Sequence, residues 1–102
     1  MPRRLRAPTT RGIVDVDVLQ TPHMAPGRLA FARRWRERTQ ILMRPEIAEG
    51  LRRGDPRALH VALHECGHVV LHQAELAGDV VASRKTEDEA DLFAAFVAGV
   101  IE

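Results

Sequence analysis

The chain has 102 residues, of which 45% are hydrophobic and 28% are charged, a composition that predicts one soluble globular domain and excludes a disordered chain. Its longest uninterrupted apolar run, Ala94 to Ile101, is far shorter than the roughly 20 residues that a membrane-spanning helix needs. The single cysteine, Cys66, excludes an internal disulfide, and no apolar stretch follows the basic N-terminus as in a secretory signal. We therefore expect a cytoplasmic protein.

The net charge of +1 is unevenly distributed along the chain. Residues 1–57 carry thirteen arginines against six acidic residues, whereas residues 58–102 carry two basic against eight acidic residues. A basic half can bind nucleic acid. These arginines are scattered, however, and the chain has no tyrosine and few aromatic residues on which bases could stack. Nucleic-acid binding is therefore the weakest of three hypotheses, and only a steep salt dependence of DNA affinity would support it.

The first half of the sequence predicts strands. Residues 1–11 are basic and show no periodicity, so we expect a disordered arm ahead of a single domain over residues 12–102. Over residues 13–19, valines alternate with aspartates, which predicts a strand with one solvent-facing side. Residues 28–36 fit a second strand or a helix, and residues 39–43 fit a short strand. Together these segments predict a small antiparallel sheet of two or three strands.

The second half predicts helices. Pro45 begins a short helix through Leu51, and Asp55–Pro56 begins a longer one, because Asp caps free N–H groups and Pro suits the first helical position. The helical pattern then continues over residues 57–73.

A last helix is expected after a loop at Gly78. Val80–Val81 fit a strand fragment within that connection. Thr86 and Glu89 have the spacing of a capping box, which predicts a helix from there to the C-terminus. Strands followed by helices predict an α+β fold, with the sheet packed on the central helix and the last helix beside it.

The central helix carries the sequence His64-Glu65-Cys66-Gly67-His68, an HExxH motif. Residues four apart lie about 40° apart around a helix, so both imidazoles can reach one metal ion. Glu65 projects beside them, where a carboxylate can act as general base on water at the metal. Apolar residues flank the motif on both sides, which predicts a partly buried helix.

A catalytic zinc ion needs a third protein ligand and an open position for water. Glu87 lies 19 positions after His68, on a helix face that is otherwise apolar and rich in small residues. Glu89 is the rival ligand, although the capping box already accounts for it. Asp91 lies one turn after Glu87, where it can orient a ligand imidazole from behind. The sequence therefore predicts a site of His64, His68 and Glu87.

Residues 63–72 (LHECGHVVLH) and 87–95 (EDEADLFAA) together resemble the ImmA/IrrE family of zinc metallopeptidases, which belongs to the gluzincins. The resemblance implies that His64, His68 and Glu87 bind Zn²⁺ and that Glu65 is the general base. It also implies a protein substrate, such as a helix-turn-helix repressor, in bacteria, mobile elements or phages. We therefore expect a zinc endopeptidase that hydrolyses a peptide bond in a regulatory protein.

The remaining candidate residues have simpler interpretations. His60 is expected at the solvent side of the helix, and His72 is expected as a polar group packed near the site, behind the ligands. His23 is expected in a loop, and Cys66 as a small buried residue. Because the chain has no tyrosine to polarise a scissile carbonyl, a non-catalytic zinc-binding interaction module stays open as the alternative function.

Overall fold

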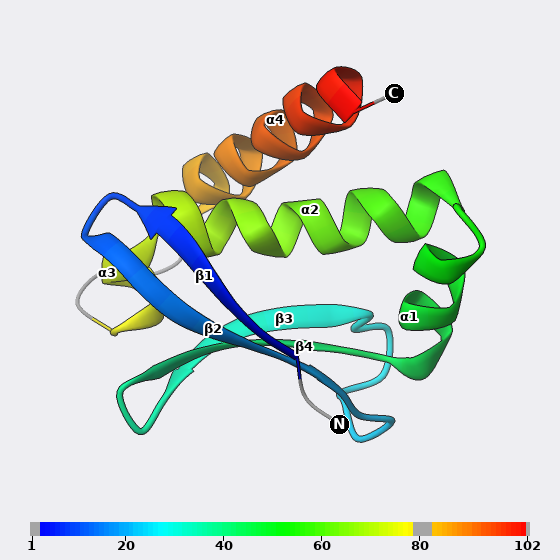
Figure 1. Cartoon of the computed structure of the whole chain (residues 1–102), viewed down its shortest axis with the longest axis horizontal. Helices are drawn as coiled ribbons and strands as arrows, with labels where there is room; N and C mark the ends of the chain where they lie inside the picture. The colour runs from blue at the N-terminus through cyan, green and yellow to red at the C-terminus, as the bar shows by residue number, and fades with distance from the viewer. Residues whose placement is uncertain (1–2, 79–82, 102) are drawn as a thin grey trace.

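The computed structural model describes residues 3–78 and 83–101, and its elements follow the chain order strands then helices (Figure 1). The strands are β1 (Arg3–Thr9), β2 (Gly12–Gln20), β3 (Ala30–Trp35) and β4 (Arg38–Met43). The helices are α1 (Pro45–Arg52), α2 (Pro56–Leu71), α3 (Gln73–Leu76) and α4 (Arg84–Ile101). The predicted α+β class is confirmed.

The four strands form one mixed sheet in the order β1-β2-β4-β3. β1 with β2 and β3 with β4 are antiparallel hairpins, but β2 and β4 pair in parallel, with Val16 opposite Thr39 and Val18 opposite Ile41. The chain leaves β2, forms β3 at the outer edge, and returns as β4 between them. The expectation of an antiparallel sheet of two or three strands is therefore wrong in the number of strands and at this central pairing.

The expectation of a disordered arm is also wrong over Arg3–Thr9, which form strand β1. A tight turn begins the pairing, with the Thr9 hydroxyl donating to the Gly12 carbonyl at 2.7 Å. Along the hairpin, Arg4 lies 3.7 Å from Asp17 and Arg6 lies 3.6 Å from Asp15. Backbone pairing and opposite charges thus hold an edge strand that has almost no apolar signal of its own.

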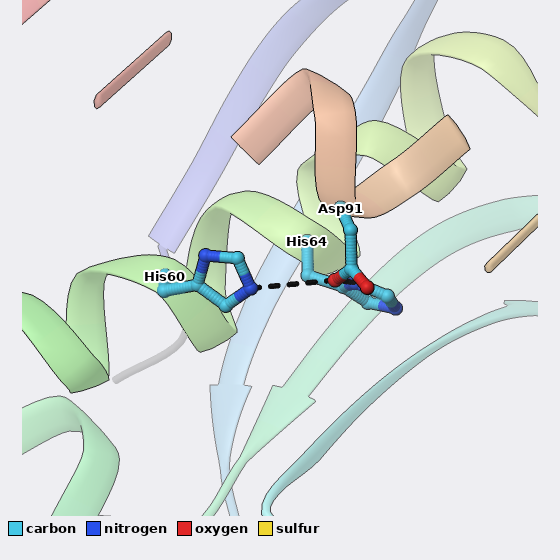
Figure 2. Close-up of side chains that lie close together, drawn as sticks. All are labelled: His60, His64 and Asp91. Carbon is cyan, nitrogen blue, oxygen red and sulfur yellow. Dashed lines mark hydrogen bonds and ion pairs between the residues drawn. The ribbon is translucent and has the colours of Figure 1, made fainter. Parts of the chain in front are cut away.

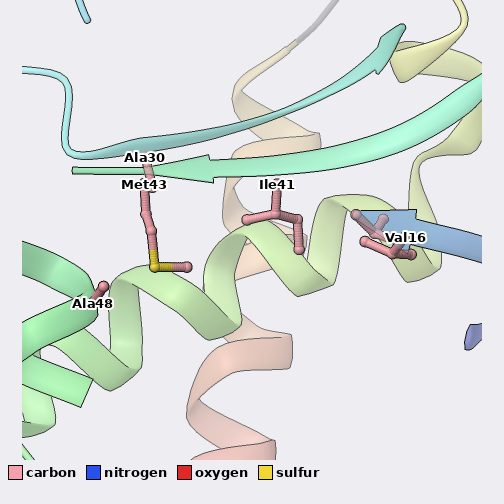
Figure 3. Close-up of a cluster of buried hydrophobic side chains, with 6 residues drawn as sticks. Val16, Ala30, Ile41, Met43 and Ala48 are labelled. Atoms are coloured by element: carbon pink, nitrogen blue, oxygen red, sulfur yellow. The ribbon is translucent and has the colours of Figure 1, made fainter. Parts of the chain in front are cut away.

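The molecule has three layers, with α2 across one face of the sheet and α4 on the far side of α2 (Figure 1). Inward-facing side chains of the sheet meet α1 and α2 in the core (Figure 3). The buried members of this core are Val16, Ala30, Ile41, Met43, Ala48 and Val69. In the second contact, between α2 and α4, Gly67 of α2 faces α4, and the small residues Ala90 and Ala94 of α4 are completely buried.

The predicted start of α2 is confirmed, since the Asp55 side chain accepts a hydrogen bond from the Arg57 N–H at 2.9 Å. The capping box predicted for α4 is displaced. Ser83 and Thr86 exchange side-chain-to-backbone hydrogen bonds of 3.1 and 3.2 Å, so the helix begins at Arg84. The strand fragment expected at residues 80–81 lies outside the described residues. None of the helices within residues 3–78 and 83–101 has the length and apolar composition to cross a membrane.

Candidate metal centre

The side chains of His64, His68 and Glu87 converge between α2 and α4. The two Nε2 atoms of the histidines lie 3.2 Å apart, and Oε2 of Glu87 lies 2.8 Å from His64 and 3.2 Å from His68. Ligand atoms at about 2.0–2.1 Å from a tetrahedral zinc ion are separated by about 3.3 Å. The three atoms therefore have the spacing and the chemistry to hold such an ion.

Close packing of the two helices brings Glu87 within reach of the histidines. A Cβ atom placed on Gly67 would lie 3.1 Å from the Ala90 Cα and 3.2 Å from a carbon of the Phe93 ring. A methyl group at position 67 would require its neighbours to shift by a few tenths of an ångström, and Ala90 opposite it is fully buried. The glycine costs helix stability of about 1 kcal/mol, but it allows the backbone of α4 to approach α2 directly.

Behind His64, the carboxylate of Asp91 accepts a hydrogen bond from Nδ1 at 2.7 Å. His60, half-exposed, also contacts this carboxylate, with Nε2 at 3.3 Å (Figure 2). Burial lowers the pKa of His64, but the carboxylates of Asp91 and Glu87 outweigh it and raise the pKa overall. The hydrogen bond to His64 lowers the pKa of Asp91. With Nδ1 occupied as a donor, Nε2 of His64 is the nitrogen left available to a metal ion.

Behind His68, a second chain of hydrogen bonds leads away from the centre. Nδ1 of His68 lies 3.1 Å from Nδ1 of His72, and Nε2 of His72 lies 3.0 Å from Oε1 of Glu89. His72 is buried, as expected for a residue packed behind the ligands. Glu89 neither caps α4 nor reaches the metal-binding atoms. It pairs with His72 instead, because α4 crosses α2 with that side chain over the C-terminal end of the motif.

Glu65 faces a cavity of about 300 Å³ on the sheet side of α2. Residues that line this cavity include Arg28, Phe31, Ala32, His64, His68 and Glu87. The pKa of Glu65 is raised to about 7. Burial and, less strongly, the negative charge of Glu87 raise this pKa, while His64 and a hydrogen bond from the Ala32 backbone partly offset them. A carboxyl group with this pKa can both take and return a proton near neutral pH.

Sequence reasoning missed Glu75, on α3. Its Oε1 lies 3.9 Å from Nδ1 of His68, and its buried Oε2 has no hydrogen-bond partner among the described residues. No motif marks this residue, because its position depends on the turn from α2 into α3.

His23 is exposed and does not line the cavity. Cys66 is half-buried against the core, and burial raises the pKa of its thiol.

Two further groups along the same face of α2 have metal-binding side chains within reach of one another. They are His60 with His64 and Asp91, and His68 with His72 and Glu75. Each shares one histidine with the central group of His64, His68 and Glu87.

No protein-family model, curated protein or solved structure matches the chain. A function must therefore be argued from this geometry and from the motifs.

Proposed function

We propose that the protein is a zinc-dependent endopeptidase of the gluzincin type, similar to the ImmA/IrrE family. The observation that carries the proposal is the convergence of two Nε2 atoms and one carboxylate oxygen within 2.8–3.2 Å of one another. Glu65, the residue next to the first histidine, lines the adjoining cavity with a pKa near neutrality. Together these supply a metal site, a base and space for a substrate.

His64, His68 and Glu87 would hold the ion through three positions and leave a fourth open. A bound zinc ion supplies Lewis acidity, which polarises a carbonyl and acidifies water. Glu65 takes a proton from the water that attacks the scissile carbonyl carbon. It then delivers that proton to the amide nitrogen as the C–N bond breaks, which leaves a carboxylate and an amine.

The motif resemblance supplies the substrate class, a regulatory protein such as a helix-turn-helix repressor, encountered in the cytoplasm. A non-catalytic zinc-binding interaction module is the second candidate. It is favoured by the absence of any tyrosine from the sequence, because no phenol can help to stabilise the developing oxyanion. The module would keep the three ligands and gain nothing from Glu65.

Metal content, measured by mass spectrometry on untagged protein, tests the centre. We expect about one zinc per chain in the wild type and in Glu89→Ala, and its loss in Glu87→Ala. Absence of zinc from the wild type, even after incubation with it, would contradict both functions.

Cleavage of a peptide library, read by mass spectrometry, separates the enzyme from the module. Glu65→Gln should retain zinc and lose cleavage by about 10²–10⁴-fold, the usual contribution of general base catalysis. Cleavage that is equal in the wild type and in Glu65→Gln would rule out the proposed mechanism. Zinc binding without any cleavage would favour the interaction module.

A further inference from the structure

A second, larger cavity of about 590 Å³ lies between α1 and the first half of α2. Its apolar lining comes from Leu29, Ile47, Ala58 and Val61. Leu29 precedes β3 and is 45% exposed, so its side chain is accessible to an occupant of this cavity. The charged residues of this lining carry both signs, so they select neither a basic nor an acidic occupant.

A row of neighbouring cavities leads from this one to the candidate metal centre. A cavity of about 310 Å³ lies between the two and shares Leu29, His60 and Val61 with the larger one. The same cavity shares His64 and Glu65 with the cavity at the centre. The three cavities therefore lie in a row along α2, here called the groove. In Figure 1, α1 lies at the N-terminal end of α2 and β3 lies beneath that helix.

The distance between the apolar cavity and the candidate metal centre indicates which residue of a bound peptide would meet each of them. A helix rises 1.5 Å per residue, so Val61, the part of the apolar lining nearest the centre, lies about 7.5 Å along the axis of α2 from the level midway between His64 and His68. An extended peptide advances about 3.3 Å per residue. A peptide in the groove would therefore place its second or third residue from the scissile bond over the apolar cavity.

We propose that this cavity is a specificity pocket for a large apolar side chain, such as Leu, Met or Phe, two or three residues from the scissile bond. The inference depends on the proposed peptidase function for the meaning of that position. It goes beyond that function because it identifies the substrate as an extended segment with an apolar anchor. Its physical basis is the transfer of the anchor from water to the lining of the pocket.

Peptide binding can be measured without turnover in the zinc-loaded Glu65→Gln protein. Fluorescence anisotropy would compare a labelled decapeptide that carries one leucine with the same peptide carrying serine there. We expect the leucine peptide to bind at least about tenfold more tightly, since one buried large apolar side chain accounts for that factor. Adding Leu29→Asp should remove the preference. Adding Leu92→Asp, the same change at an exposed leucine of α4 outside the groove, should leave it intact.

Equal affinity for the two peptides, or a preference that survives Leu29→Asp, would overturn the pocket. Cleavage of the leucine peptide by the otherwise unaltered protein then locates the scissile bond. A bond two or three residues from the leucine supports the proposal, and a bond adjacent to the leucine contradicts it. Selective binding with no cleavage would refute the peptidase function and leave the apolar pocket established.

Discussion

The hydrogen bonds of His68 connect it, through His72, to a carboxylate on another helix. Glu89 accepts from Nε2–H of His72, which makes Nδ1 of His72 the acceptor for Nδ1–H of His68. The lone pair at Nε2 of His68 is then free for a metal ion. This assignment of tautomers makes Glu89 a positioning residue rather than a ligand.

We therefore expect Glu89→Ala to retain one zinc ion per chain but to bind it about tenfold more weakly, as is usual when a partner of a ligand imidazole is removed. Competition with a chelator of known affinity measures the change. Asp88→Ala removes the same charge from the neighbouring, exposed position and serves as the control. An equal loss in both variants would mean that Glu89 acts only through its charge.

Helical spacing explains why His64 and His68 could be selected from the sequence, since residues four apart share a face wherever the helix lies. Glu87 could be selected because it is the acidic residue on the otherwise apolar, small-residue face of the next helix. The partner of Glu89 could not be selected in the same way. Thr86 and Glu89 have the spacing of a capping box, but Ser83 and Thr86 form the cap instead. Which acid meets His72 depends on the angle at which α4 crosses α2, and no local pattern encodes that angle.

At the level of elements, the contact between α2 and α4 depends on the absence of a side chain at position 67. Gly67→Ala should gain about 1 kcal/mol in helix propensity but lose about 1–3 kcal/mol to overpacking against the backbone of Ala90. Backbone atoms cannot move as a flexible side chain can, so we expect the overpacking to dominate. Urea unfolding should show a lower free energy of unfolding, and a chelator titration should show weaker zinc binding.

Gly99→Ala is the matched control, because a Cβ there would meet nothing within 4 Å. This variant should raise the free energy of unfolding by about 0.5–1 kcal/mol and leave zinc binding unchanged. If Gly67→Ala also stabilised the protein, the claim that close packing of α2 and α4 requires glycine at position 67 would be wrong.

The elements that the sequence predicted well have strong local signals. Alternation of valine and aspartate marked β2, and Asp55–Pro56 marked the start of α2. β1 has no such signal. Five of its seven residues are exposed, and it is held by its hairpin pairing with β2. The parallel pairing of β2 with β4 joins segments about twenty residues apart, and its hydrogen bonds do not depend on which side chains are present.

For the whole molecule, Asp17 links three of the four strands. Its buried carboxylate, in β2, accepts two hydrogen bonds from Arg38 of β4, at 2.6 and 2.7 Å, and lies 3.7 Å from Arg4 of β1. The hydrogen bond from Arg38 lowers the pKa of Asp17 in the folded protein, although burial opposes the shift. The unfolded chain therefore binds this proton more readily than the folded one does.

It follows that Asp17 stabilises the fold above the ordinary aspartate pKa of about 4, and that this contribution disappears as the pH falls through the lowered folded value. Asp17→Asn should lower the free energy of unfolding at pH 7, and its difference from wild type should shrink below about pH 4. Urea unfolding of both proteins between pH 7 and below about pH 4 measures this difference in the free energy of unfolding. Asp15→Asn, on the same strand in an exposed pair of 3.6 Å, should show little effect at any pH.

The division of the chain into strands and then helices also sets an order of events during translation. The sheet is complete at Met43, but α2, which covers its apolar face, ends only at Leu71. At about 5–20 residues per second, a ribosome leaves Val16, Ile41 and their neighbours uncovered for a few seconds. The candidate metal centre is complete later still, since Glu87 is synthesised after both histidines. A nascent chain must therefore survive an aggregation-prone interval before the residues of that centre can come together.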